Sequence, residues 1–360
     1  MRLLMPHAGQ LGMSSDEDKG MDSHHASSNG EGKRLPRDSA GFVDLPPEHG
    51  GIKAMVGFDG FIEIYTVHAT YCMKTPDDLD PKRTVPYMPW SQSLHAPVGA
   101  SNPIVARIVI ELVDALGNWP LRNGDRGGIK RHLRACKEDL LVCETTYSRL
   151  KAQYDAIVKQ ITEKGLKTQR NVVECPSLPN VRDEAAAFLS SAKRALQCVG
   201  EIFNQFYVPD DKKPSVANAN FEFAISRLKS SEPIDQELIS YLEGVVPTTK
   251  YFVDLRNGLE HPGETDATVI EDFRLIPEGI IPPSWRRGII AKESPIIDKM
   301  REFLGFAVDF CEHVFFFGLT DNILVTLPHE FSVEPIPRDQ IDLECPVRYR
   351  FGLSSKPRQV

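Results

Sequence analysis

The chain has 360 residues and a formal net charge of −8, with 41% hydrophobic and 26% charged residues. This length suits one large domain or two smaller ones, and the composition is typical of a folded globular protein. The acidic balance argues against a protein that coats nucleic acid over its whole surface. A local basic groove remains compatible with it, because charges act over about 8–10 Å in physiological salt.

Several other classes of protein receive no support. The seven cysteines are scattered without a Cys-x-x-Cys pair, so we expect reduced thiols in the cytoplasm and no zinc site or other metal. No apolar run suggests a membrane span, and the first residues lack a secretory signal. The chain also lacks a phosphate loop, a dinucleotide fingerprint, a nucleophile elbow and a His-Glu-x-x-His motif. We therefore expect no cofactor.

The N-terminal third divides into two parts. Residues 1–50 are rich in Ser, Gly, Asp and His, which predicts a disordered tail. Residues 51–127 are expected to form a β-rich region, because branched and aromatic residues alternate with other side chains between 61 and 68. A proline-rich connector and a short helix over 103–116, ended by Gly117, complete this region.

A long amphipathic helix and a linker are predicted over 128–180. Apolar residues recur at spacings of three and four, which is the heptad pattern of a helix packed on another helix. They are Leu133, Cys136, Leu140, Cys143, Tyr147, Leu150, Tyr154, Ile157 and Ile161. The flanking charges leave open whether the partner helix is in this chain or in a second copy. Ten Lys or Arg against five Asp or Glu over 130–170 could meet RNA, although a solvated helix face explains them more simply.

Residues 181–320 are predicted to be mostly helical. One helix begins after Asn180, which can act as its cap, and another covers 217–229. A further helix opens at Ser231-Glu232-Pro233, is kinked or restarted by Pro247, and stops at Pro262-Gly263. A β-hairpin over 266–283 should turn at Pro277-Glu278-Gly279, and a strongly apolar helix follows Ser294-Pro295. Residues 321–360 should form short strands, most clearly 323–327 and 347–351.

The candidate site is Arg256-Asn257-x-x-x-His261, at the end of the helical run over 248–260. Arginine offers a fixed positive charge whose donors fit a phosphate, and histidine carries a proton near neutral pH. The bare string is weak, because Arg2 to His7 and Arg126 to His132 also match it. The first of these lies in the predicted tail, and the second in a predicted turn.

Helical context favours Arg256 over the two other matches. Five residues of a regular helix turn about 500°, so Arg256 and His261 would point about 140° apart. The residue before a proline avoids the helical conformation, however, and Pro262 follows His261. His261 is therefore expected at the helix edge, where its ring can swing back toward Arg256.

This arrangement resembles the HEPN superfamily of helical domains, many of which are metal-independent ribonucleases. The resemblance covers about 140 residues, from 181 to 318, and includes the stretch Phe188-Leu189-Ser190-Ser191-Ala192-Lys193-Arg194-Ala195-Leu196. It implies a mainly α fold, α+β overall. The expected architecture is a HEPN-like helical bundle over 181–320 with an inserted β-hairpin, the long heptad helix, and β-rich segments at both ends.

The resemblance also implies a function and its residues. His261 would move the proton of the RNA 2′-hydroxyl or of the leaving oxygen, Arg256 would bind the phosphate, and Asn257 would support either of them. The substrate would be RNA, and the cleft would form between two copies of the chain in a homodimer. A toxin or phage-defence effector, with an antitoxin or regulatory partner, fits this implication.

Three other interpretations stay open. Arg256 could simply pair with Asp254, Glu260 or Glu264 while His261 ends the helix. A HEPN-like module could bind RNA, a nucleotide or a protein without cleaving anything. The chain could also be a structural protein built on the heptad helix, with no site at all.

Overall fold

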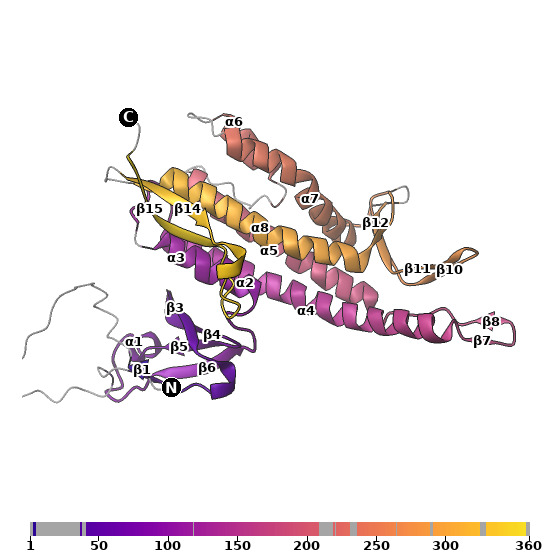
Figure 1. Cartoon of the computed structure of the whole chain (residues 1–360), viewed down its shortest axis with the longest axis horizontal. Helices are drawn as coiled ribbons and strands as arrows, with labels where there is room; N and C mark the ends of the chain where they lie inside the picture. The colour runs from indigo at the N-terminus through magenta and orange to yellow at the C-terminus, as the bar shows by residue number, and fades with distance from the viewer. Residues whose placement is uncertain are drawn as a thin grey trace, which may run out of the picture. The chain divides into compact units, whose positions relative to one another are not determined.

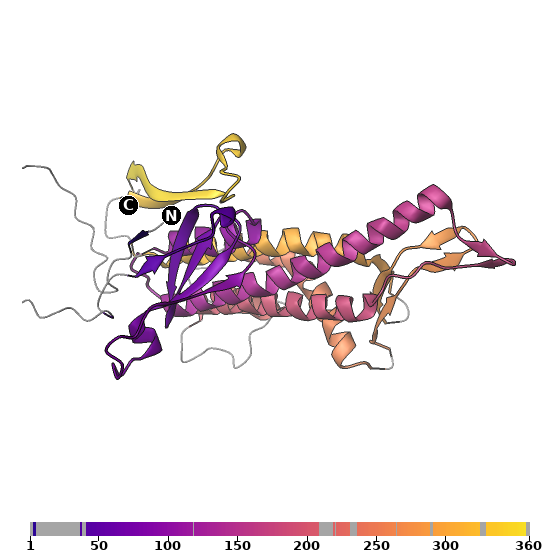
Figure 2. The same ribbon diagram turned by 90° about the horizontal axis from the view of Figure 1, so that it is seen from below.

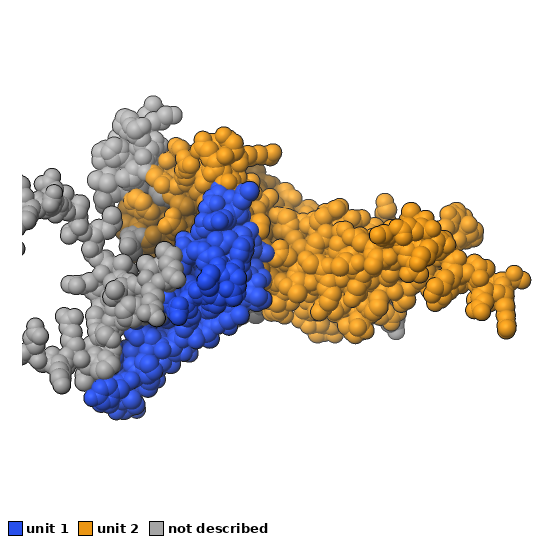
Figure 3. Space-filling model, turned by 60° about the horizontal axis from the view of Figure 1, so that its bottom comes forward, with its two compact units in different colours: residues 1–102, 342–346 blue, residues 103–341, 347–360 orange. Residues whose placement is uncertain are grey.

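A computed structural model describes residues 3–4, 37, 41–117, 119–208, 219, 221–230, 236–263, 265–288, 291–324 and 329–357. These residues fall into two compact units (Figure 3). Unit 1 consists of residues 1–102 together with 342–346, and unit 2 consists of residues 103–341 together with 347–360. Each unit is described by itself below.

Unit 1 is built on a four-stranded antiparallel sheet in the order β3-β4-β5-β6. Its strands are β3 (Ile52–Phe58), β4 (Phe61–Thr66), β5 (Thr70–Lys74) and β6 (Ser91–Ala96). The β3–β4 hairpin turns at Asp59-Gly60, where Gly60 has a φ of 80° that an Asp-Gly turn requires. The inner side chains pack into one apolar cluster that includes Ile64, Tyr71 and Met73. The β-rich character expected of this region is therefore confirmed.

The prediction of a disordered tail over 1–50 is wrong for residues 41–50. β2 (Phe42–Val43) pairs with β1 (Leu3–Leu4), and a 3-10 turn, η2 (Pro47–His49), follows. Val43 is fully buried in the apolar cluster of the sheet, and Leu45 packs beside it. The average composition of the first fifty residues is polar, so it did not indicate that this short apolar segment packs on the sheet. The rest of the predicted tail, apart from residues 3–4 and 37, lies outside the described residues.

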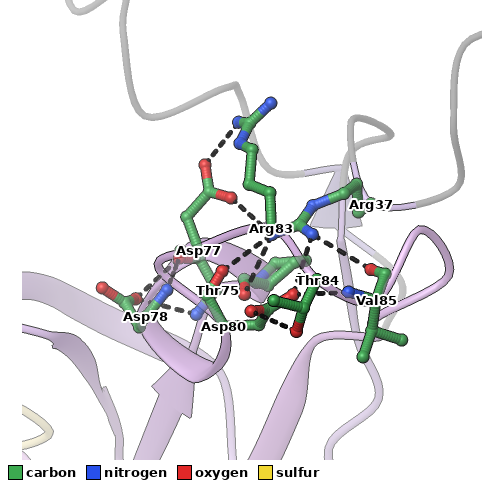
Figure 4. Close-up of polar contacts among 9 residues, drawn as sticks. Arg37, Thr75, Asp77, Asp78, Asp80, Arg83, Thr84 and Val85 are labelled. Atoms are coloured by element: carbon green, nitrogen blue, oxygen red, sulfur yellow. Dashed lines mark hydrogen bonds and ion pairs between the residues drawn. The ribbon is translucent and has the colours of Figure 1, made fainter.

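A buried arginine ties the start of unit 1 to the loop after α1 (Pro76–Leu79) (Figure 4). The Arg37 guanidinium donates to Asp77 at 2.7 Å, to Asp80 at 3.1 Å and to the Val85 carbonyl at 3.0 Å. Hydrogen bonds from the Val85 and Thr84 backbone N–H groups hold the pKa of Asp80 at about 2. Arg83 also pairs with Asp77 at 2.6 Å, so two arginines face two aspartates and the cluster is an internal structural network.

Unit 2 contains a layer of long helices centred on α5 (Val181–Tyr207), which packs against α4, α7 and α8 (Figures 1 and 2). The long helices are α4 (Arg126–Lys164), α7 (Gln236–Glu260) and α8 (Ile296–Asn322). The shorter helices are α2 (Pro103–Val105), the π-helical η3 (Ala106–Glu111), α3 (Leu112–Leu116) and α6 (Glu222–Lys229). α7 runs through Pro247 as one helix. Asn180 precedes α5 in a left-handed conformation without a side-chain cap, so its expected capping role is wrong.

The heptad stripe of α4 is covered within this chain. Between Leu133 and Leu150 its residues are buried against α5 and α8, except for the half-buried Tyr147, and beyond them Tyr154 stacks on Phe273. At the N-terminal end, Asp125 caps α4 by accepting from the Gly127 and Gly128 N–H groups. The segment from Arg126 to His132 is therefore the first part of a helix and not the predicted turn.

Several small sheets accompany the helices. The expectation of a mainly α, HEPN-like helical bundle is therefore wrong. The chain is 53% helical and 19% strand, which makes it a mixed α+β fold with several small sheets. In unit 2, β9 (Thr268–Glu271), β12 (Ser284–Arg287) and β13 (Ser294–Pro295) form one sheet. β10 (Arg274–Ile276) and β11 (Gly279–Ile281) form a hairpin that turns at Pro277 and Glu278, and β7 (Thr168–Gln169) pairs with β8 (Val172–Val173).

The C-terminal segment forms a longer hairpin than the sequence predicts. β14 (His329–Pro335) pairs with β15 (Tyr349–Pro357), and the 3-10 turn η5 (Arg338–Gln340) lies between them. The expected strand over 323–327 is reduced to one bridge, between Ile323 and Leu121, and residues 325–328 lie outside the described residues.

A buried carboxylate holds the start of β15 against the helices. Glu111 of η3 is 2% exposed, and its Oε2 accepts the backbone N–H groups of Arg348 and Tyr349. The Arg348 and Arg107 guanidinium groups contact Asp309 of α8 and also lie near the buried Glu312. Burial and the nearby Glu312 charge raise the pKa of Glu111 to about 8.

α8 is a strongly apolar helix of this layer. By length and composition alone it could cross a membrane, contrary to the expectation of no such segment. Its most apolar stretch has a mean hydropathy of 1.4, and 56% of that stretch is buried in the protein. Phe303, Phe310 and Phe315 are fully buried, and they contact rings of α5, α6 and α7 or of the segments beside them.

Candidate functional site

The predicted site lies at the C-terminal end of α7. Arg256 and Asn257 belong to the last turn and a half, Glu260 is the final helical residue, and His261 follows immediately. The His261 N–H still donates to the Asn257 carbonyl at 2.9 Å, while its side chain is 83% exposed. His261 therefore lies at the edge of the helix, as expected from Pro262, while its ring is exposed and lies near Glu260.

Strand β9 fixes this helix end. A Cβ on Gly258 would lie 2.5 Å from Thr268 Oγ1 and 2.6 Å from the Asp266 carbonyl oxygen. The absent side chain lets the strand approach, and the Thr268 hydroxyl donates to the Leu255 carbonyl at 2.7 Å. That bond joins β9 to the backbone of α7 one turn before the helix ends. The glycine inside the motif is thus a packing requirement of the site.

Glu260 brings Arg256 and His261 together. The Arg256 guanidinium forms an ion pair with Glu260, and His261 Nε2 lies 4.0 Å from the same carboxylate oxygen. The pairing that was one of the open alternatives for Arg256 is therefore present. Asp254 pairs instead with Arg287 at 2.8 Å, and Glu264 lies outside the described residues.

A lysine from α5 completes the site from the other side. Lys193 Nζ donates to Asn257 Oδ1 at 2.8 Å. Burial and the neighbouring Arg256 charge lower the pKa of Lys193, and burial together with Arg194 lowers that of Arg256. Arg194 itself pairs with Asp139 at 2.7 Å. Arg256 thus lies close enough to both Lys193 and Arg194 for like charges to repel.

This arrangement leaves hydrogen-bond donors of Asn257 and Arg256 without a partner in the described part of the protein. An ammonium can only donate, so Asn257 must turn its oxygen toward Lys193 and its Nδ2 donors away. Among the described residues, the hydrogen bond from Lys193 is the one found for the Asn257 side chain, and Arg256 Nε is buried without a partner. A cluster of donors with excess positive charge suits an anion with several oxygens, such as a phosphate.

Sequence reasoning placed Arg256, Asn257 and His261 and gave Lys193 no role. Lys193 and Arg194 were included only in a stretch that resembles a family helix. A lysine on the otherwise apolar face of a helix was a usable signal, but helical periodicity does not say which residue of another helix it meets. Two other pairs match the motif. In the pair Arg2 and His7, both residues lie outside the described residues.

Comparison with family models, with curated proteins and with solved structures finds no match for this chain. The function is therefore argued from the site alone.

Proposed function

We propose that this chain is a metal-independent endoribonuclease whose Arg256, Asn257 and His261 act as the Arg-polar-x-x-x-His residues of HEPN-type enzymes. The observation that carries the proposal is the shared carboxylate. Arg256 and His261 both lie against Glu260, so a phosphate-binding cation and a proton carrier lie at one place on the surface.

The chemistry requires a phosphate-binding cation and groups that accept and donate a proton. The RNA 2′-oxygen attacks the phosphorus, a new 2′-O–P bond forms, and the P–O5′ bond breaks to leave a cyclic phosphate and a 5′-hydroxyl. His261 takes the 2′ proton or gives one to the leaving oxygen. Arg256 and the Asn257 amide offset the charge that builds up on the phosphate oxygens.

A second copy of the chain would complete the reaction. The step needs one group that accepts a proton and another that donates one, and each chain offers a single histidine at this site. Two copies with adjoining α7 ends would supply both, which is the homodimer that the family resemblance implies.

The test is cleavage of a labelled RNA in the presence of EDTA by wild type, His261→Ala and the control His68→Ala. His68 is an exposed histidine of unit 1. Loss of general acid–base catalysis should slow the His261 variant by about 10²–10⁴-fold and leave the control unchanged. Equal rates for wild type and His261→Ala would refute the site, and binding without cleavage would favour a non-catalytic RNA-binding module.

A further inference from the structure

Lys193 is placed in a way that structural packing alone does not explain. It is half-buried on α5, it lies next to the like charge of Arg256, and its one hydrogen bond goes to a neutral amide. Among the described residues no carboxylate lies within ion-pair distance of it. A lysine that only joined two helices would be more stable against a carboxylate, because burial and a second cation both disfavour its charge.

We propose that Lys193 is a phosphate-binding residue of this site, acting with Arg256 and Asn257 on the backbone of single-stranded nucleic acid. Two of its three N–H donors remain for a ligand, since one is used on Asn257. The third N–H of Lys193 gives it a second role as a positioning residue, because it holds the Asn257 oxygen and so leaves the Asn257 N–H donors for a ligand. The site then draws its phosphate ligands from two helices, α5 and α7.

The ligand class follows from the donor set. Lys193, Arg256 and the Asn257 amide nitrogen offer donors to a ligand, because the Asn257 oxygen is already bonded to Lys193. The acidic group beside them, Glu260, pairs with Arg256. A phosphodiester supplies the missing negative charge and several acceptor oxygens. Nothing in this contact reads a base, so binding should depend on salt more than on sequence.

This inference rests on the proposed function for its substrate, and a ligand that cannot be cleaved separates the two. A fluorescent single-stranded oligodeoxynucleotide lacks the 2′-hydroxyl, so its binding reports the phosphate contacts alone. We compare wild type, Lys193→Ala, Lys193→Gln and Lys229→Ala over a range of salt concentrations. Lys229 is the matched control, since it is an exposed lysine of α6 paired with Glu243 at 2.7 Å.

Loss of one phosphate contact should lower the slope of log K against log salt by about 0.7 in both Lys193 variants. Lys193→Gln keeps a donor for Asn257 and should therefore bind more tightly than Lys193→Ala. The Lys229 variant should keep the wild-type slope. Far-UV circular dichroism confirms that each variant is folded.

Two results overturn the inference. One is a Lys193→Ala slope and affinity equal to those of wild type and of Lys229→Ala. The other is the absence of binding by the wild type even at low salt. Failure of the proposed function looks different, because the wild type would then bind the oligodeoxynucleotide through Lys193 and leave RNA intact.

Discussion

Glu111 makes the stability of unit 2 fall as the pH rises. Its Oε2 accepts two backbone N–H groups of β15, while its Oε1 is buried without a hydrogen-bond partner. Glu312, Asp309, Arg107 and Arg348 surround it, so three carboxylates face two guanidinium groups. One negative charge is in excess, and that charge is removed when Glu111 is protonated.

The sign follows from proton linkage. The pKa of Glu111 rises from its ordinary value of 4.5 to about 8 on folding, so the folded chain holds more protons than the unfolded chain between these values. Stability is therefore greatest below pH 4.5 as far as this group is concerned, and is lost as the pH rises to about 8. At 1.36 kcal/mol per pKa unit the loss is at most about 5 kcal/mol.

Glu111→Gln tests this directly. The amide oxygen can still accept from Arg348 and Tyr349, but the side chain carries no charge at any pH. We expect urea unfolding to give similar stabilities for the two proteins near pH 5. Near pH 8.5 the variant should be more stable by a few kcal/mol, up to the bound of about 5. Taking the difference between the proteins cancels other titrating groups. A difference that does not change with pH would refute the reasoning.

Two further predictions concern the site. Gly258→Ala should destabilise unit 2 by about 1–3 kcal/mol, despite the better helix propensity of alanine, because the new Cβ would overlap Thr268 and the Asp266 carbonyl; unchanged thermal and urea unfolding would contradict the packing argument. Glu260→Gln should tighten oligodeoxynucleotide binding by about two- to fivefold, since a carboxylate that competes for Arg256 is worth about 0.5–1 kcal/mol at a partly exposed pair. Weaker binding in fluorescence anisotropy would mean that Glu260 supports the ligand instead of competing with it.

The long helices were predictable because each buries an apolar stripe. The periodicity of Leu133 to Leu150 and of Phe188 to Phe206 locates α4 and α5 within a few residues, and Gly165 and Pro262 mark two of the helix ends. Those signals are local, and they depend only on the residues of the segment itself.

The features that sequence reasoning missed are contacts between distant segments. β9 pairs with β12 across the β10–β11 hairpin, and nothing in either four-residue strand specifies that partner. The hydrogen bond between Lys193 and Asn257 joins residues 64 positions apart in the sequence, and the one between Glu111 and Arg348 joins residues 237 positions apart. The candidate motif could be selected from the sequence because Arg256, Asn257 and His261 lie within six consecutive residues at one helix end.

The contact between Gly258 and β9 also determines which of the strands after α7 could be replaced without loss of the site. β10 and β11 pair only with each other within the described residues, so residues 275–280 form an extension that a short connector could replace. β9 cannot be replaced in this way, because its Thr268 hydroxyl donates a hydrogen bond to the Leu255 carbonyl near the end of α7. Shortening the hairpin within residues 275–280 should thus be tolerated. Loss of the contact between β9 and α7 should instead make the segment that carries Arg256 and His261 less ordered.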